Sequence, residues 1–346
     1  MELSTIRGSL APEAAHRWDD FVAGHPRATL YHTSRWVSFA ADVFGFEPAW
    51  LTAESTGPLL TGVLPLIRQT SRLFGDRWVS LPYFNYGGPL GADAPTERRL
   101  MDAAVSLARR TETKMLEIRD VEARLDYALR TDKATLVLDL PEAIDELSER
   151  LGAKLRSQIR RANREQPEVA EGGVELVGEF YGVFAETMRD LGTPAYPRRF
   201  FELMFDRVGV DCRIVIVRLG GQTAAAALLT HHRATVEIPW AGSLRRFRTA
   251  AVNMRLYWEC LRHTVESRYS RFDFGRSTVG SGTYRFKQQW GAHPVPLYWY
   301  YPLEPAGLMT PAHQGRLTTA ARAVWCRLPV PFATRLAASF SGGLPW

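Results

Sequence analysis

The residues best suited to chemistry lie in one stretch, RFDFGRSTVGSGTYRFKQQWGAHP, which spans residues 271–294. Its pattern predicts a strand that ends at Gly275, then a flexible turn at 280–282 that leads into a short helix. Arg276 would lie at the carboxyl end of this strand, where open α/β sheets place their ligands. Lys287 would lie in the first turns of the helix. The stretch therefore predicts two cations near one edge of a sheet.

Two interpretations of this helix stay open on pattern alone. Phe286 and Trp290 lie four residues apart, which is typical of core positions, and Lys287 would then be their exposed neighbour. Lysine is scarce, however, because the chain uses arginine for nearly all of its cations. The four lysines are Lys114, Lys133, Lys154 and Lys287. A compact ammonium in this position favours a specific role for Lys287.

Composition limits the class of protein. With 346 residues, 46% apolar and 23% charged, the chain is expected to be globular, with about two domains. Three scattered cysteines without a CxxC pair, and histidines without metal spacing, predict neither a disulfide framework nor a metal site. No apolar run approaches the roughly 18 residues that a membrane span needs, and no signal peptide is seen, so the expected compartment is the cytoplasm. The net charge of +6 suits nucleic acid, anionic lipid or a phosphorylated ligand.

The spacing of apolar residues predicts the same order of elements twice: two helices and three strands, then helix, strand, helix and strand. In the first half the helices are expected at 11–21, 34–44, 96–110 and 121–130, and the strands at 49–55, 59–69, 76–83, 114–120 and 134–140. In the second half the helices are expected at 179–192, 197–209, 250–267 and 282–292, and the strands at 212–219, 222–232, 234–242, 270–275 and 295–303.

Three strands joined by hairpins and followed by a β-α-β crossover give a mixed sheet covered by helices. This is the order of the Gcn5-related (GNAT, acyl-coenzyme A N-acyltransferase) fold. The sequence therefore predicts an α/β class with α+β mixed sheets, built as two tandem GNAT-like domains; one larger α/β domain is the alternative. The domains are expected at 1–145 and 146–304, followed by a basic amphipathic tail at 305–346.

The GNAT fold usually carries a [QR]xxGx[GA] turn, in which backbone N–H groups at a helix N-terminus bind a pyrophosphate. Residues 246–251 occupy the corresponding place, with Thr249 instead of the central glycine. Arg246 and Arg248 lie beside it. Their side chains could hold a phosphate in place of the backbone.

Two further segments are unusually basic. Residues 150–164 hold six basic residues and no acid, and Arg156, Arg160 and Arg164 share one helix face. This helix is either a solvated linker or a basic surface for an anionic ligand. The tail at 305–346 has four arginines and no acid. It either contacts a membrane surface peripherally, at the inner face, or packs on the second domain.

Several motifs resemble the Fem family of FemA/FemB/FemX-like aminoacyltransferases. They are LYHTSRWVSFAADVFGF, GVLPLIRQTSRLFG followed by SLPYFNYGGPLG, MRDLGTP and RFDFGRS…GTYRFKQQWG, and the likeness spans roughly residues 25 to 300. Within the family, the chain is most similar to the subgroup associated with exosortase (PEP-CTERM) and exopolysaccharide systems. The resemblance implies two Gcn5-related domains. It also implies transfer of an aminoacyl group to an amine of a cell-envelope precursor.

The resemblance also assigns candidate residues. The family's Phe-Lys pair falls on Phe286 and Lys287, and its lysine is expected to stabilise the acyl-transfer oxyanion. The position of the motif, apart from the resemblance, gives further candidates in the second domain: Arg276 would anchor an anionic group, Asp273 or Glu237 would act as base and Tyr284 as acid. The first domain would bind a small-molecule, glycan or peptide acceptor. Its expected acceptor-binding residues are Tyr31, Trp36, Asn85 and Tyr86.

The donor stays open between aminoacyl-tRNA and acyl-coenzyme A, each as a co-substrate and neither as a tightly bound cofactor. The helical hairpin that bridge-forming Fem proteins insert for tRNA is missing, and the pyrophosphate turn departs from the usual motif at Thr249. The alternative function is that of a non-catalytic, degenerate acyltransferase that serves as a binding module for a polysaccharide or an exosortase-system partner.

Overall fold

The computed structural model describes residues 2–57, 59–72, 74–124, 126–309 and 316–344. The chain forms two compact units. Unit 1 comprises Met1–Lys133, Pro296–Pro311 and Gly342–Trp346, and unit 2 comprises Ala134–Val295 and Ala312–Ser341. The first boundary thus lies about a dozen residues before the expected one, and residues 296–311 return to unit 1 instead of ending the second domain.

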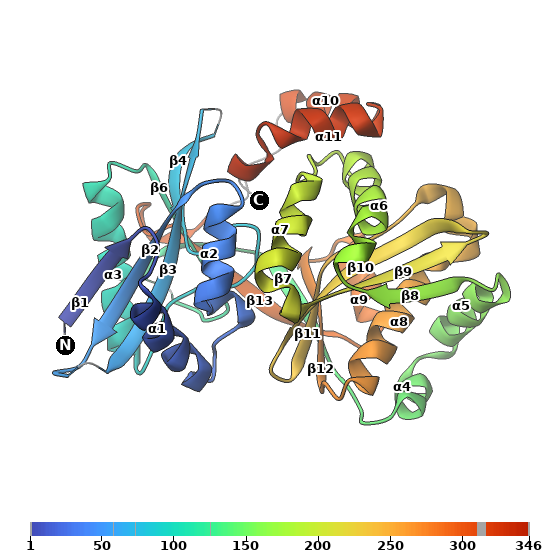
Figure 1. Cartoon of the computed structure of the whole chain (residues 1–346), viewed down its shortest axis with the longest axis horizontal. Coiled ribbons are helices and arrows are strands. Elements are labelled where there is room, and N and C mark those ends of the chain that lie inside the picture. Colours follow the sequence, from blue (N-terminus) through green and yellow to red (C-terminus); the bar gives the residue numbers. More distant parts are fainter. Residues whose placement is uncertain (1, 58, 73, 125, 310–315, 345–346) are drawn as a thin grey trace. The chain divides into compact units, whose positions relative to one another are not determined.

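Unit 1 is a mixed sheet with helices (Figure 1). Its strands run in the order β1-β2-β3-β4-β6, and β6 pairs with the second half of β13. Neighbours are antiparallel except β4 and β6, which are parallel. The strands are β1 (Glu2–Arg7), β2 (Glu47–Glu54), β3 (Leu60–Ser71), β4 (Gly75–Val79), β5 (Leu90–Gly91), β6 (Met115–Asp120), β13 (His293–Tyr300) and β14 (Gly307–Leu308), and the helices are α1 (Pro12–Gly24), α2 (Ser34–Asp42) and α3 (Ala94–Arg110).

The helix expected at 121–130 is wrong. The next element after β6 is the strand β7 (Ala128–Asp139). The carboxylate of Asp120 accepts hydrogen bonds from the N–H groups of Val121 (2.7 Å) and Glu122 (3.2 Å), and these bonds fix a turn directly after the strand. Such a side chain competes with helical hydrogen bonding, which the apolar spacing alone does not reveal.

Unit 2 has the strand order β7-β12-β11-β10-β9-β8, and β11 and β12 are parallel. The element order predicted for the second half, from α6 to β13, is confirmed; β8 was not expected. The strands are β8 (Glu168–Gly172), β9 (Cys212–Leu219), β10 (Gln222–His232), β11 (Thr235–Ser243) and β12 (Arg271–Thr278), and the helices are α4 (Ile144–Arg150), α5 (Ala153–Arg164), α6 (Val177–Asp190), α7 (Arg198–Val208), α8 (Val252–Glu266) and α9 (Gly282–Gln288).

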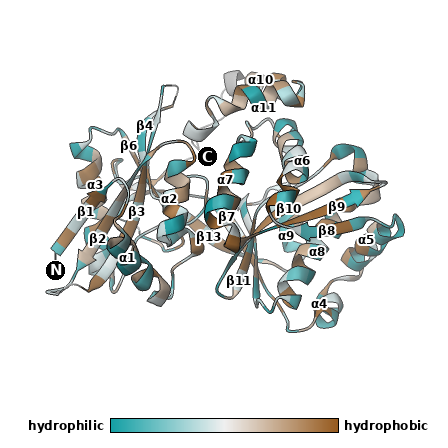
Figure 2. Cartoon of the chain, viewed as in Figure 1, coloured by the Kyte–Doolittle hydropathy of each residue, from teal (hydrophilic) through white to brown (hydrophobic). Residues whose placement is uncertain are grey.

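Helices cover both faces of this sheet. In β9, Val215 and Val217 belong to the core under α5 and α8, whereas Ile214 and Ile216 alternate with them and are equally buried. Since successive side chains of a strand point to opposite faces, α6 covers the second face. Figure 2 shows β9 as apolar along most of its length. A sheet buried on both sides presents chemistry only at its strand ends.

The C-terminal tail forms two helices, α10 (Arg316–Trp325) and α11 (Val330–Ala338), which pack on unit 2. Arg189 donates to the carbonyl of Leu328 (2.9 Å), and Arg322 donates to that of Leu191 (2.9 Å). Of the two outcomes expected for the tail, packing on the second domain is therefore present. Among the described residues, no helix combines the length and apolar character needed to cross a membrane.

The buried side of α11 gives a test of this packing. Ala337 is fully buried, whereas Ala338 beside it is exposed. We expect Ala337→Leu to lower the free energy of unfolding by about 1–3 kcal/mol through overpacking, and Ala338→Leu to change it by under about 0.5 kcal/mol. Denaturant titration measures both. Equal stabilities for the two variants would show that α11 does not pack as described.

Candidate functional site

Lys287 lies in α9 and is buried, with 7% of its surface exposed. Its Nζ donates hydrogen bonds to the carbonyls of Gly275 (2.8 Å) and Arg276 (3.1 Å). Both lie within β12, which continues to Thr278, so the strand end expected at Gly275 is wrong. The interpretation of Lys287 as an exposed neighbour of the core is therefore wrong. An ammonium has three N–H donors, and no other described residue takes the third.

The backbone at Gly275 makes this contact possible. Gly275 has φ +72°, and a Cβ placed there would lie 3.1 Å from the carbonyl oxygen of Ile238. In a regular strand, successive carbonyls point in opposite directions. The left-handed conformation, which glycine adopts without strain, lets the carbonyls of Gly275 and Arg276 both reach Lys287.

Two buried carboxylates lie close to this ammonium. Asp273 and Glu237 are direct partners in the register of β11 and β12, and each is more than nine-tenths buried. Burial lowers the pKa of Lys287 to about 8; Asp273 raises that pKa, Arg276 lowers it further and Glu237 raises it. Lys287 is therefore largely charged at neutral pH but loses its proton near pH 8.

The aromatic residues of α9 fix the helix to the core. Phe286 contacts Tyr257 edge-on, with ring centroids 5.0 Å apart, and Trp290 is buried behind it. Tyr284 packs half-buried against the same core. Ser281 accepts a hydrogen bond from the N–H of Tyr284 (3.2 Å) and so caps the helix start.

Two residues near Lys287 were not singled out from the sequence. Thr135 of β7 donates a hydrogen bond to the Asp273 carboxylate. Ser277 follows Arg276, and its buried hydroxyl has no hydrogen-bond partner among the described residues. Ser277 belongs to the RFDFGRS motif but was given no role there. Thr135 stands in no recognised motif, so only the tertiary structure connects Thr135 with the site.

The turn before α8 holds the expected phosphate-binding arginines. Arg246 pairs with Glu186 (3.0 Å), whereas Arg248 is exposed. Ala251 starts α8 with φ +55°, a left-handed conformation that is unusual for a residue other than glycine. Of the two arginines, Arg248 is therefore the one without an acidic partner among the described residues.

The basic face of α5 is only partly available to a ligand. Arg156 donates hydrogen bonds to the carbonyls of Glu149 (3.1 Å), Leu151 and Ser148. These carbonyls lie at the C-terminal end of α4, where they have no N–H partner within the helix. The expectation of a ligand-binding Arg156 is thus corrected to a helix-capping one. Arg160 and Arg164 are exposed, and neither contacts another described side chain in a hydrogen bond or ion pair.

The expected acceptor residues of unit 1 separate into two pairs. Trp36 and Tyr31 are almost fully buried, and Tyr31 stacks on Phe84 with centroids 4.3 Å apart. They belong to the core and do not form an accessible acceptor surface, because aromatic rings in this aromatic-rich segment are buried together. Asn85 and Tyr86 are half-buried, and Tyr86 lines a small cavity of about 20 Å³.

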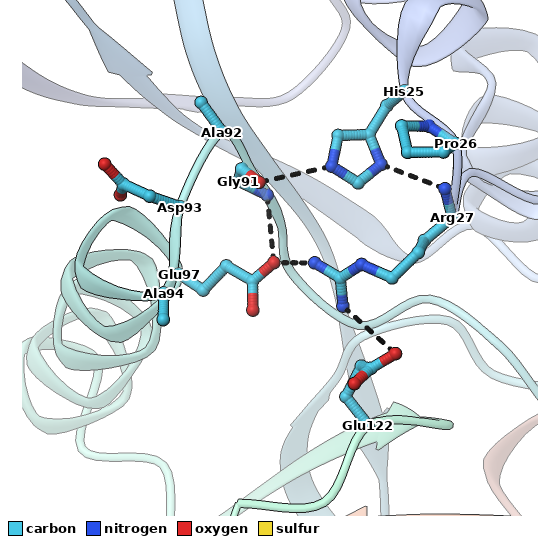
Figure 3. A pocket seen from close by; sticks show the side chains of 9 residues that line it. All are labelled: His25, Pro26, Arg27, Gly91, Ala92, Asp93, Ala94, Glu97 and Glu122. Atoms are coloured by element: carbon cyan, nitrogen blue, oxygen red, sulfur yellow. Dashed lines mark hydrogen bonds and ion pairs between the residues drawn. The ribbon is translucent and has the colours of Figure 1, made fainter.

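A larger cavity of about 480 Å³ opens in unit 1 and was not anticipated (Figure 3). Arg27 reaches into it and pairs with Glu97 and, at 3.7 Å, with Glu122. His25 lies against the carbonyl of Gly91 (3.2 Å). The full lining is His25, Pro26, Arg27, Gly91, Ala92, Asp93, Ala94, Glu97 and Glu122. Glu97 also accepts a hydrogen bond from Arg124 (2.6 Å), so two guanidiniums offset the three carboxylates. This polar lining suits hydroxyl or amine groups.

Residues 150–288 match the family model described as "Acetyltransferase (GNAT) domain". A crystal structure of FemX is similar, at 14% identity and a TM-score of 0.63, over 87% of this chain and 97% of that chain. A tandem GNAT protein from the clavulanic acid biosynthesis pathway is 14% identical, with a TM-score of 0.53, over 88% and 100% of the two chains. The C-terminal domain of a putative lysylphosphatidylglycerol synthetase from Agrobacterium fabrum is 13% identical, with a TM-score of 0.56, over 90% and 96%.

No curated protein matches the chain. The structural similarities show the fold, and the predicted tandem GNAT fold is confirmed. The family model places an acetyltransferase-type domain on unit 2, the unit that holds Lys287. The chain is thus an acyltransferase of GNAT fold.

The titration of Lys287 can be measured directly. With lysine labelled by ¹³C at Cε, the four lysines give four NMR signals, and the one lost in Lys287→Arg belongs to Lys287. We expect its midpoint at about pH 8, because burial favours the neutral amine. A midpoint above pH 10 would mean that Lys287 is solvated and would contradict its buried position.

Proposed function

We propose that the protein is a Fem-like N-acyltransferase. It would transfer an acyl or aminoacyl group from an activated donor to an amine of a cell-envelope or exopolysaccharide precursor. The observation that carries this proposal is the buried ammonium of Lys287, held by two carbonyls with its third N–H unused, in a GNAT domain. The resemblance of the Phe286-Lys287 pair to the Fem motif supports the same assignment.

In the proposed reaction, the neutral acceptor amine attacks the acyl carbonyl and a C–N bond forms. The carbonyl oxygen becomes an oxyanion, which accepts a hydrogen bond from the third N–H of Lys287. The C–O or C–S bond to the donor then breaks, and the leaving group takes a proton, with Tyr284 as the candidate acid. The amine proton passes to a carboxylate, for which Asp273 and Glu237 are the candidates.

The donor would be held by side chains rather than by a glycine turn. Arg248, Arg160 and Arg164 are exposed cations on unit 2, the first in the turn before α8 and the others on α5. Arg255 of α8 donates to Asn163 of α5 (2.7 Å), which connects the C-terminal end of α5 with the start of α8. This arrangement suits the phosphates of aminoacyl-tRNA or acyl-coenzyme A.

Unit 1 is the proposed acceptor-binding unit, and Arg276 of unit 2 is the proposed anchor for an anionic group. The cavity around Arg27, Glu97 and Glu122 offers hydrogen-bond partners for the hydroxyl or amine groups of a sugar or peptide. Asn85 and Tyr86 stay candidates, and Tyr86 lines the small cavity. The tail supports a further part of the proposal, peripheral contact with an anionic membrane, since Phe332 and Leu336 are exposed on a helix pair without acids.

The role of Lys287 is tested by Lys287→Met, which keeps the length of the side chain and removes its charge. We expect single-turnover transfer to fall about 10²-fold or more, as for loss of one oxyanion donor. In the parent, activity should fall as the pH rises through about 8, where Lys287 loses its charge. Lys154→Met, at an exposed lysine, is the control. Normal turnover in folded Lys287→Met would remove Lys287 from the mechanism and favour the binding-module alternative.

The donor site is tested by the double variant Arg160→Gln, Arg164→Gln. Binding of a charged RNA minihelix or of acetyl-coenzyme A is measured at several salt concentrations. We expect weaker binding and a flatter salt dependence for the ligand that is the donor, because two phosphate contacts are lost. Arg161→Gln, on the neighbouring face of α5, is the matched control. Unchanged binding of both ligands would leave α5 as a solvated helix.

A further inference from the structure

Thr135 is a buried polar residue that the proposed reaction does not use. It lies in the part of β7 that belongs to unit 2, next to β12 in the strand order, and only 1% of its surface is exposed. Its hydroxyl donates to Oδ1 of Asp273. A threonine side chain in a strand can be buried for packing alone, but this one contributes its hydroxyl to a charged group.

The same carboxylate oxygen organises the backbone beyond it. Oδ1 of Asp273 also accepts a hydrogen bond from the N–H of Gly275 (2.8 Å). A side chain that accepts from the N–H two residues further on closes a local turn. At this turn Gly275 takes its left-handed conformation. The carbonyls of Gly275 and Arg276 then accept hydrogen bonds from Nζ of Lys287. One chain of contacts thus runs from Thr135 to Lys287.

Asp273 also acts on Lys287 through its charge. Burial lowers the pKa of Lys287, and the Asp273 carboxylate raises it. A hydrogen bond donated to a carboxylate favours the ionised form. The Thr135 hydroxyl therefore supports a negative charge in an interior where water does not, and this negative charge supports the positive charge of Lys287. The other charged groups that act on Lys287 are Arg276 and Glu237.

We propose that Thr135 is a positioning residue that, through Asp273 and the turn at Gly275, fixes both the place and the charge of Lys287. The inference rests on the proposed function only in that Lys287 takes part in the reaction. The physical statement about Lys287 stands by itself and has its own measurement.

The variants Thr135→Val and Thr135→Ser separate the hydroxyl from the shape of the side chain. Valine keeps the shape and removes the donor, whereas serine keeps the donor. With Cε-labelled lysine, we expect the Lys287 midpoint to fall by about half a pH unit or more in Thr135→Val and to stay within about 0.2 unit in Thr135→Ser. Single-turnover rates should fall about tenfold in Thr135→Val, with the high-pH decline moved to lower pH, and recover in Thr135→Ser.

An unchanged Lys287 midpoint in Thr135→Val would overturn the proposal. Equal losses in Thr135→Val and Thr135→Ser would also overturn it, since the methyl group and not the hydroxyl would then matter. Should Thr135→Val not fold, Thr135→Ala removes the same hydroxyl without placing a methyl group against the carboxylate, and the same shift is expected. A shifted midpoint together with normal turnover in Lys287→Met would sink the proposed function and leave the positioning of Lys287 standing.

Discussion

The structure around the candidate site in unit 2 depends on one buried ammonium. Lys287 is more than nine-tenths buried, and a charge in such a place is costly unless the protein replaces the water that it loses. Two carbonyls and the nearby carboxylates do this. The carbonyls are available only because β12 leaves its regular conformation at Gly275. Gly275, Asp273 and α9 therefore act together to stabilise the buried positive charge of Lys287.

The sheet holds the groups around Lys287 in fixed positions. β11 and β12 are parallel, so Glu237 and Asp273 are held in register at neighbouring strand positions. Helices cover both faces of the sheet, and the deviation at Gly275 lies in the second half of β12. Phe286 and Trp290 fix α9 against the core from the other side. A short helix on a rigid sheet can hold an ammonium within hydrogen-bond geometry of an acyl group, which oxyanion stabilisation requires.

Much of the fold of unit 2 and the place of Lys287 could be predicted from the sequence. Which of the candidate residues are buried could not. Local spacing located the helices and strands of the second half, the turn before α9 and Lys287 itself. It failed where tertiary contacts decide: the Asp120 carboxylate makes a turn where a helix was expected. Arg156 lies on the predicted basic face but caps α4, and Trp36 is enclosed by its aromatic neighbours. The connection from Thr135 to Asp273 spans 138 residues of sequence, and no local pattern reports it.

The turn before α8 is the reason for proposing that side chains recognise the donor. A glycine turn at a helix start offers backbone N–H groups already in place for a pyrophosphate. Here Thr249 stands at the central position, and only Ala251 adopts the left-handed conformation. Exposed arginines bind phosphates less rigidly and each contributes little in water. Recognition by such cations favours a donor with several phosphates over an extended length, and it weakens with salt, whereas a backbone cradle favours one compact pyrophosphate.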